Sequence, residues 1–252
     1  MSILDKFRLD NRVAIVTGGN RGLGKEMSAA LVEAGAKVAV VSRKTEEARA
    51  AASAYGGSAR GYGCDVTEPE QVEAMVSQVA ADFGGVDILV NNAGVNIRGA
   101  IDELSLEEFQ QVQNINVTGV WLVTRAAAPH LKASNYGRVI NIGSTLSIIA
   151  LPERTPYASS KGAVLQMTRA LALEWASRGI TVNAVLPGPF ATDMNLPLMQ
   201  DEEKYRAFLS LIPLGRWGEL DEIGGLIVFL AGDAASFITG AGITIDGGWT
   251  AR

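Results

Sequence analysis

The feature that most restricts the fold of this chain is a glycine-rich turn between an apolar strand and a helix. Val13-Ala-Ile-Val-Thr17 is typical of a buried strand, and a helix is expected over about residues 23–34. The glycines of the turn let the backbone approach a pyrophosphate, whose charge the N-terminus of the helix favours. An ordinary tight turn is the alternative, but a glycine cluster in the first strand–helix unit indicates nucleotide binding. The candidate contacts are Gly18, Asn20, Arg21, Gly22, Leu23 and Gly24.

Strand-like and helical segments alternate along the rest of the chain, whose 252 residues suit one α/β domain. Further strands are expected at residues 37–41, 59–66, 86–90, 138–142, 180–186 and 243–245. The alternation predicts a single domain over residues 1–252, a doubly wound parallel sheet with helices on both faces. Ligands are then expected at the carboxyl ends of the strands.

Composition excludes several other classes of protein. A net charge of −5 argues against a nucleic-acid partner, and no apolar run approaches the length of about 18 residues that a membrane span needs. Cys64 is the only cysteine and His130 the only histidine, so an internal disulfide is impossible and a zinc or other metal site is not expected. We therefore expect a cytoplasmic protein that contacts no membrane, with Cys64 as a small buried core residue.

The second strand ends at Ser42-Arg43-Lys44, which bears on the choice of nucleotide. Dinucleotide folds that use NAD carry an acidic residue about 20 positions beyond the glycines, where it binds the adenosine ribose. No carboxylate is present at this position, and Arg43, Lys44 and Arg21 could pair with a 2′-phosphate. The alternative is that these side chains are solvated surface charges. We expect NADP(H) to be preferred, with NAD(H) still possible.

A serine, a tyrosine and a lysine after the fifth strand form a candidate acid–base group. The strand ends in Gly143-Ser144, and Tyr157 follows Ser144 by thirteen positions. Lys161 lies four residues beyond Tyr157 in a helix opened by Pro156, so the two side chains should share a face. A phenol titrates near pH ~10, and a neighbouring ammonium lowers that pKa. With Ser144 bonding a substrate oxygen, this set suits the interconversion of a carbonyl and an alcohol.

The Ser144, Tyr157 and Lys161 spacing resembles the active site of the short-chain dehydrogenase/reductase family. Agreeing motifs span practically the whole chain: T-G-x-x-x-G-x-G at 17–24, Asp65-Val66, Asn91-Asn-Ala-Gly94, Asn114-Ile-Asn116 and Pro187-Gly188-Pro-Phe-Ala-Thr192. The resemblance implies a Rossmann-like fold and reversible hydride transfer between a nicotinamide and a carbonyl or secondary alcohol, without a metal. It also implies that Asn116 completes the catalytic set by holding a water beside Lys161.

The same resemblance implies the remaining cofactor contacts and the assembly of the protein. The cofactor contacts beyond the glycine turn are Ser42, Arg43, Asp65, Val66, Asn92, Ala93, Gly94, Tyr157, Lys161, Pro187, Gly188, Phe190 and Thr192. The helix after Lys161 is apolar around much of its circumference, and similar proteins pair this helix across a dimer interface. A homotetramer or homodimer is therefore expected. Trp121 and Leu122 are both expected in the core.

Residues 193–217 interrupt the alternation of strands and helices, and their apolar and aromatic side chains predict a lid over the substrate. A packed excursion without ligand contact is the alternative. Candidate substrate contacts are Asn96, Arg98, Leu146, Arg154 and Met194. The two arginines would suit a carboxylate, although Arg154 could instead pair with Glu153 or with another subunit.

Several functions remain open at this point. The segments around residues 149–157 and 187–217 look most like the branch of the family that contains gluconate 5-dehydrogenase-type, sugar-acid oxidoreductases, and 3-oxoacyl-thioester reductases are the alternative. A cofactor-binding regulator without turnover and a structural subunit of a larger assembly are the non-enzymatic possibilities. The complete set of Asn116, Ser144, Tyr157 and Lys161 argues against the regulator.

Overall fold

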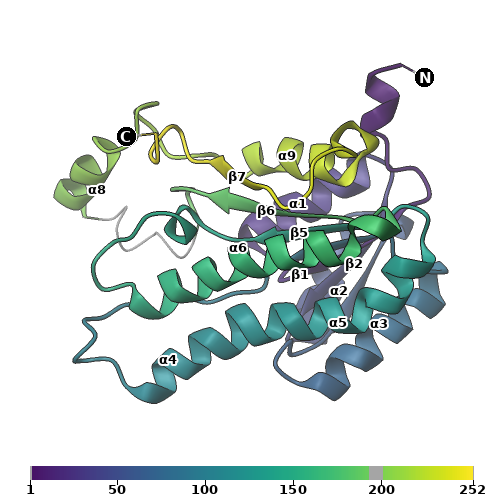
Figure 1. Ribbon diagram of the computed structural model, residues 1–252, viewed down its shortest axis with the longest axis horizontal. Coiled ribbons are helices and arrows are strands. Elements are labelled where there is room, and N and C mark those ends of the chain that lie inside the picture. Colours follow the sequence, from purple (N-terminus) through teal and green to yellow (C-terminus); the bar gives the residue numbers. More distant parts are fainter. Residues whose placement is uncertain (1, 193–200, 252) are drawn as a thin grey trace.

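The computed structural model describes residues 2–192 and 201–251, and within these the chain forms one parallel, seven-stranded sheet (Figure 1). The strand order is β3-β2-β1-β4-β5-β6-β7. The strands are β1 (Val13–Thr17), β2 (Lys37–Ser42), β3 (Ala59–Gly63), β4 (Ile88–Asn91), β5 (Arg138–Ile142), β6 (Thr181–Pro187) and β7 (Gly242–Ile245). The order of strands reverses direction between β1 and β4, and ligands of open α/β sheets bind at such a point.

Helices cover both faces of the sheet, as the alternation of segments predicts (Figure 1). The α-helices of the described residues are α1 (Gly22–Glu33), α2 (Thr45–Ser53), α3 (Pro69–Phe83), α4 (Leu106–Gln113), α5 (Gly119–Ala133), α6 (Thr155–Trp175), α8 (Glu202–Leu209), which lies beyond the ends of the strands, and α9 (Glu222–Ala231). Helices α1 and α9 pack together on one face, while α3, α5 and α6 contribute to the apolar layer on the other. The expected doubly wound architecture is confirmed.

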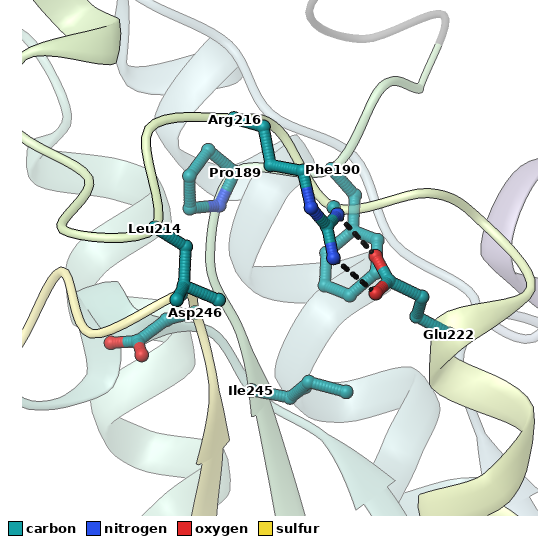
Figure 2. A pocket seen from close by; sticks show the side chains of 9 residues that line it. Pro189, Phe190, Leu214, Arg216, Glu222, Ile245 and Asp246 are labelled. Atoms are coloured by element: carbon teal, nitrogen blue, oxygen red, sulfur yellow. Dashed lines mark hydrogen bonds and ion pairs between the residues drawn. The ribbon is translucent and has the colours of Figure 1, made fainter.

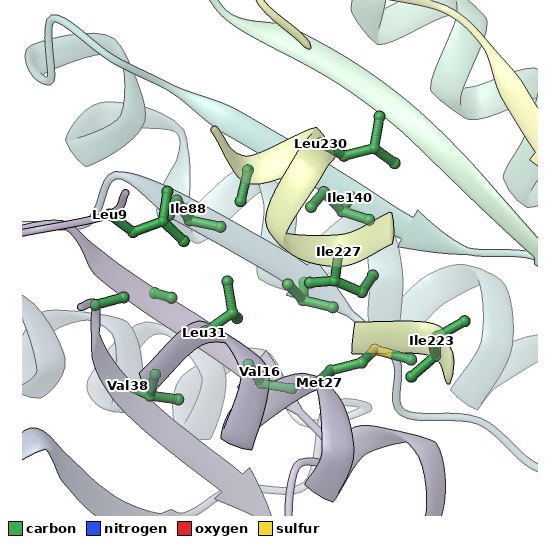
Figure 3. Close-up of a cluster of buried hydrophobic side chains, with 14 of the residues drawn as sticks. Leu9, Val16, Met27, Leu31, Val38, Ile88, Ile140, Ile223, Ile227 and Leu230 are labelled. Atoms are coloured by element: carbon green, nitrogen blue, oxygen red, sulfur yellow. The ribbon is translucent and has the colours of Figure 1, made fainter. Parts of the chain in front are cut away.

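The apolar layer under α1 and α9 fixes the helix that follows the glycine turn. Met27 and Leu31 of α1 meet Ile223 and Ile227 of α9 over the sheet, and none of the four is accessible to solvent (Figure 3). Each such side chain contributes about 1.5–3 kcal/mol when it is fully buried. This burial anchors α1 on the sheet and thereby fixes the position of the glycine turn that precedes it.

A ladder of polar side chains crosses the middle of the sheet, where β4 and β5 pair Asn91 with Asn141. Asn91 donates from Nδ2 to Asn141 Oδ1 (2.8 Å) and to Thr124 Oγ1 of α5 (2.9 Å). Asn141 donates in turn to Thr168 Oγ1 of α6 (2.9 Å). All four side chains are buried, so the ladder ties two strands to the two helices below them.

Two expectations about single buried residues have opposite outcomes. Cys64 is buried as expected, and burial raises the pKa of its thiol to about 12. The expectation that Trp121 lies in the core is wrong, because 49% of this residue is exposed. Leu122 and Val123 occupy the inner face of α5, which leaves Trp121 pointing outward beneath the guanidinium of Arg125 (5.4 Å).

The segment expected to be a lid is described only from residue 201 onward. This part contains α8, whose Phe208 packs against Trp217 (5.2 Å between ring centroids) and Trp249 (5.3 Å). Residues 193–200, which include the candidate substrate contact Met194, lie outside the described residues. None of the helices in residues 2–192 and 201–251 combines the length and the apolar character that crossing a membrane requires.

Candidate active site

The glycine turn after β1 has the geometry that a phosphate cradle needs. Gly18 and Gly22 have positive φ angles of 63° and 51°, a region that only glycine enters without strain. A Cβ on Gly24 would lie 2.0 Å from the carbonyl oxygen of Gly18, so no larger residue fits there. Helix α1 begins at Gly22 without a side-chain cap, which leaves its first N–H groups free for an anion.

Asn92 braces this turn from the end of β4. Its Nδ2 donates to the carbonyl oxygens of Thr17 (2.9 Å) and Gly18 (3.1 Å). The Thr17 hydroxyl in turn accepts from the backbone N–H groups of Asn92 (3.0 Å) and Ala93 (3.1 Å). The two strand ends on either side of the switch point are therefore fixed to each other, as the motif predicts for asparagine amides beside Ala93 and Gly94.

The adenosine side of the expected cofactor site lies at the ends of β2 and β3. Ser42 is buried and donates its hydroxyl to the carbonyl of Lys44 (2.8 Å), whereas Arg43 is exposed beyond it. The carboxylate of Asp65 accepts from the N–H and the hydroxyl of Thr67 (2.9 and 2.8 Å), which fixes its orientation beside the buried Val66. No acidic residue stands at the end of β2 itself.

Asn116 lies in a π-helical turn, Asn114–Thr118, between α4 and α5. Its side chain is fully buried and accepts from Val95 N–H while donating to Val95 O (both 2.9 Å) and to Ser160 Oγ (3.0 Å). A Cβ on Gly94 would approach both Asn116 Oδ1 (3.2 Å) and Lys161 Nζ (3.6 Å). The π-turn, an irregularity common at functional sites, thus aims Asn116 at the loop after β4 and brings it near the lysine.

Lys161 is buried near the start of α6, with only 5% of the residue exposed. Its Nζ donates to the backbone carbonyl of Ile142, at the end of β5, over 2.7 Å. Burial lowers the pKa of this ammonium to about 8, so the group stays mostly charged at neutral pH. The lysine also lies over the ring of Tyr157, 5.6 Å from its centroid, as the shared helix face predicts.

The pKa of the Tyr157 phenol is raised in this structure, whereas the neighbouring Lys161 is expected to lower it. The pKa is raised because burial disfavours the phenolate, and hydrogen bonding from Ser144 and the charge of Arg98 oppose that effect. Lys161 is not among the causes of this shift, so a lowering of the Tyr157 pKa by its ammonium stays a prediction. The ammonium lies over the ring of Tyr157 and donates to the carbonyl of Ile142.

Ser144 is held by a second serine that the sequence pattern did not single out. The Ser144 hydroxyl oxygen accepts from Leu146 N–H (3.1 Å), and the Ser144 N–H donates to Ser147 Oγ (3.2 Å). Ser147 Oγ then donates to the backbone carbonyl of Lys161 (2.8 Å). One hydroxyl therefore joins the turn that carries Ser144 to the helical turn that carries Lys161. Only its position three residues after Ser144, the end of a capping box, could have indicated this role.

We expect Ser147→Ala to lower kcat about three- to tenfold, because two backbone groups lose their partner and the Ser144 and Lys161 turns can separate. Ser147→Thr, which keeps the hydroxyl, should recover most of the activity. The measurement is steady-state kinetics of the three proteins, with the thermal unfolding of each as the control for the fold. An unchanged kcat in Ser147→Ala, or an equal loss in Ser147→Thr, would contradict this role.

The candidate nicotinamide contacts follow β6. Pro187 ends the strand, and a Cβ on Gly188 would collide with Asp246 at 2.5 Å. The ring of Phe190 is buried in the apolar cluster under α9. The backbone N–H of Thr192 donates to the carbonyl of Phe190 (2.8 Å). A cavity of about 350 Å³ opens beside this segment, with the Arg216–Glu222 pair on its wall (Figure 2). Ser144, Tyr157 and Lys161 do not line it.

Arg98 and Arg154, the two candidate substrate arginines, lie on loops that touch each other. The carbonyl of Glu153 accepts both from Gly99 N–H (3.2 Å) and from Arg154 Nη1 (2.8 Å). Glu153 has a positive φ of 59°, a strained conformation for a residue with a side chain. The pKa of Arg154 is lowered by burial and then by the charge of Arg98, so the two cations are close.

Two other candidate substrate contacts, Leu146 and Asn96, lie within the described residues. Leu146 is buried, and Asn96 is partly buried, as Arg154 is. The Asn96 Oδ1 atom is buried and has no hydrogen-bond partner in the described part of the chain. Together with the charge of Arg98 at the Tyr157 phenol, this places a polar, basic surface beside the acid–base group.

Comparisons with known proteins agree with this geometry. A family model described as enoyl-(acyl carrier protein) reductase matches residues 18–250. A short-chain type dehydrogenase/reductase from Mycobacterium marinum has the same fold, with 40% identity, a TM-score of 0.94 and full coverage of both chains. The chain belongs to the short-chain dehydrogenase/reductase family.

Other members of the short-chain dehydrogenase/reductase family are similar over the same length. A gluconate 5-dehydrogenase from Burkholderia cenocepacia, solved with NADP and tartrate, is 38% identical with a TM-score of 0.96 and full coverage of both chains. The 2-dehydro-3-deoxy-D-gluconate 5-dehydrogenase of Pseudoalteromonas atlantica is 38% identical over 99% of this chain and 100% of its own length. The expected family, Rossmann-like fold and class of reaction are therefore confirmed, and the protein is an oxidoreductase that acts on a small molecule.

Proposed function

We propose that this short-chain dehydrogenase/reductase uses NADP(H) in preference to NAD(H) to interconvert the carbonyl and secondary alcohol of a sugar acid. One observation carries the acid–base part: the Tyr157 phenol bonds to Ser144, and the Lys161 ammonium lies over the Tyr157 ring and near Gly94. The nicotinamide cofactor, when bound, supplies or accepts the hydride. The chain binds and orients the reactants and moves the proton.

The roles of the four side chains follow from their contacts. Tyr157 gives its proton to the substrate oxygen in reduction and takes one from the alcohol in oxidation, while Ser144 donates a hydrogen bond to the same oxygen. Lys161 supplies a positive charge beside the ring and binds the nicotinamide ribose. Asn116, which holds the loop after Gly94 and lies near Lys161, anchors the water that links the lysine to solvent.

The cofactor site is proposed from the groups at the carboxyl edge of the sheet. The uncapped start of α1 holds the pyrophosphate, Asp65 and Val66 hold the adenine, and Asn92 to Gly94 line the ribose. Pro187, Gly188, Phe190 and Thr192 hold the nicotinamide, with Phe190 contributing its backbone because its ring is buried. Ser42, Arg43 and Arg21 favour a 2′-phosphate, since β2 ends without an acid.

A carboxylate on the substrate is supported by the two arginines. Arg98 and Arg154 are held side by side by the strained Glu153 turn, and Arg98 acts on the phenol of Tyr157. A guanidinium grips a carboxylate through two parallel hydrogen bonds. The orphaned Asn96 Oδ1 atom suits a substrate hydroxyl. The gluconate 5-dehydrogenase that was solved with tartrate, a dicarboxylate, agrees with this choice.

We expect Arg98→Met and Arg154→Met each to raise the KM for a sugar acid by about five- to tenfold, because a partly solvated ion pair is lost. The KM for an uncharged ketone of similar size should change by less than about twofold. Arg178→Met, in the 3-10 turn Ala176–Arg178 that follows α6, is the matched control because it also removes one cation. If the charged and uncharged substrates respond alike, the arginines support the loops rather than bind a carboxylate.

A substrate panel run with both cofactors tests the function as a whole. It includes sugar acids such as gluconate, uncharged polyols and ketones, and 3-oxoacyl thioesters. The proposal expects the highest kcat/KM for a sugar acid with NADP(H). A higher kcat/KM for a 3-oxoacyl thioester would indicate a 3-oxoacyl-thioester reductase. The absence of cofactor turnover with every compound would favour a regulator or a structural subunit.

Residues 193–217 are proposed as the lid, and the protein as a cytoplasmic homodimer or homotetramer. The packing of Phe208 between Trp217 and Trp249 fixes the part of this segment that follows residue 201.

Apolar side chains that are exposed on α4, α5 and α6, among them Phe109, Trp121 and Leu173, support an interface between subunits. The mass of the purified protein in solution distinguishes a homodimer from a homotetramer.

A further inference from the structure

Glu47 brings a carboxylate into the basic cluster at the end of β2. It lies in the first turn of α2, three residues after Lys44. One carboxylate oxygen pairs with Lys44 Nζ (2.9 Å), and the other accepts from Asn20 Nδ2 in the glycine turn (3.2 Å). Glu47 therefore bridges the two segments that surround the adenosine ribose in the proposed cofactor site.

The charges around Glu47 are those assigned to the 2′-phosphate. Hydrogen bonding and charge from Lys44, followed by the charges of Arg21 and Arg43, hold the pKa of Glu47 below its ordinary value. Lys44, Arg21 and Arg43 are exposed, so the cluster is open to a ligand. A carboxylate at this place occupies the hydrogen-bond donors that an incoming phosphate would use, and it carries the same sign of charge.

We propose that Glu47 is an internal competitor of the 2′-phosphate that moderates the preference of this enzyme for NADP(H) over NAD(H). In the absence of a 2′-phosphate, the carboxylate neutralises Lys44 and ties α2 to Asn20. When a 2′-phosphate binds, Glu47 must leave Lys44 and Asn20, which weakens the binding of NADP(H). The inference rests on the proposed preference for NADP(H) and explains how NAD(H) can remain a usable cofactor without an acid at the end of β2.

The decisive variant is Glu47→Gln, which removes the charge and keeps the length of the side chain. We expect it to tighten the binding of a 2′-phosphate ligand by roughly three- to tenfold, since a like charge in a solvated cluster is removed. The gain should shrink in about 1 M salt, where the screening length falls to about 3 Å. Glu46→Gln is the matched control, because Glu46 is exposed in the same helical turn and loses the same charge.

Isothermal titration calorimetry with 2′,5′-ADP and 5′-AMP measures the effect without turnover, because these nucleotides differ only in the 2′-phosphate. The proposal expects E47Q to tighten 2′,5′-ADP alone, with 5′-AMP changed by less than about twofold. An unchanged or weaker affinity for 2′,5′-ADP, an equal gain for both nucleotides, or the same gain in E46Q would overturn it.

The proposed cofactor preference is judged separately, on the wild-type protein. Equal affinity of the wild type for 2′,5′-ADP and 5′-AMP would contradict that preference. The role of Glu47 would still be decided by whether E47Q alone tightens 2′,5′-ADP. Titration of NADPH and NADH by nucleotide fluorescence then extends the result to the whole cofactors.

Discussion

Tyr157→Phe is expected to lower kcat by about 10²-fold or more, which is the usual contribution of positioned acid–base catalysis. The substitution removes the phenol oxygen that Ser144 bonds and leaves the ring over which Lys161 lies. Cofactor affinity should therefore stay within about twofold of the wild type. Steady-state kinetics combined with nucleotide titration is the measurement. A turnover close to that of the wild type would remove Tyr157 from the mechanism.

The pH dependence of the wild type gives an independent check on the same group. Reduction needs the protonated phenol, which predominates at neutral pH because burial raises the pKa of Tyr157 above its ordinary value. Oxidation needs the phenolate, whose fraction grows about tenfold per pH unit below that pKa. The rate of oxidation should thus rise with pH from neutrality into the alkaline range, while the rate of reduction stays level near neutral pH. Tyr157→Phe should abolish this rise.

Arg43→Ala should weaken the binding of NADPH by about tenfold to hundredfold, the effect of losing one charge-assisted contact of roughly 1.5–3 kcal/mol. The affinity for NADH should change far less, because NADH lacks the 2′-phosphate. Arg43 is exposed at the end of β2, so its removal leaves the core intact. Arg49→Ala is the matched control, since Arg49 is also an exposed arginine, farther along α2. Equal losses for the two cofactors would show that Arg43 does not contact a 2′-phosphate.

Much of the fold could be predicted because its signals are local. Strands β1 and β5 begin and end at the residues that the apolar pattern indicates. A buried parallel strand is a short continuous apolar run, which can be read directly from the sequence. The π-turn at Asn116 could not be predicted from periodicity, because the apolar pattern does not mark the position at which one extra residue enters a helical turn.

The errors come from contacts that no local pattern encodes. The sequence spacing placed Lys161 and Tyr157 on one face, but which atom the ammonium contacts depends on Ile142, nineteen residues earlier. Trp121 looked like a core residue by its type, yet the inner face of α5 was already filled by Leu122 and Val123. Ser147 and Glu47 have ordinary sequence neighbourhoods. Their contacts exist only once the strand ends and helix starts are brought together in three dimensions.

The amide ladder between Asn91 and Asn141 has a consequence for how this protein could change its substrate. A shift of one residue in the pairing of β4 with β5 would place both amides among apolar side chains without hydrogen-bond partners. The ladder therefore specifies the register of the two strands. These strands deliver Asn92 and Ser144 to the site, and the hydrogen bonds of the ladder join β4 and β5 to α5 and α6 rather than to the loops that carry Arg98 and Arg154. The substrate loops can therefore be exchanged for those of a relative while the chemistry beneath them keeps its alignment, which makes this chain a suitable scaffold for transplanting a new specificity.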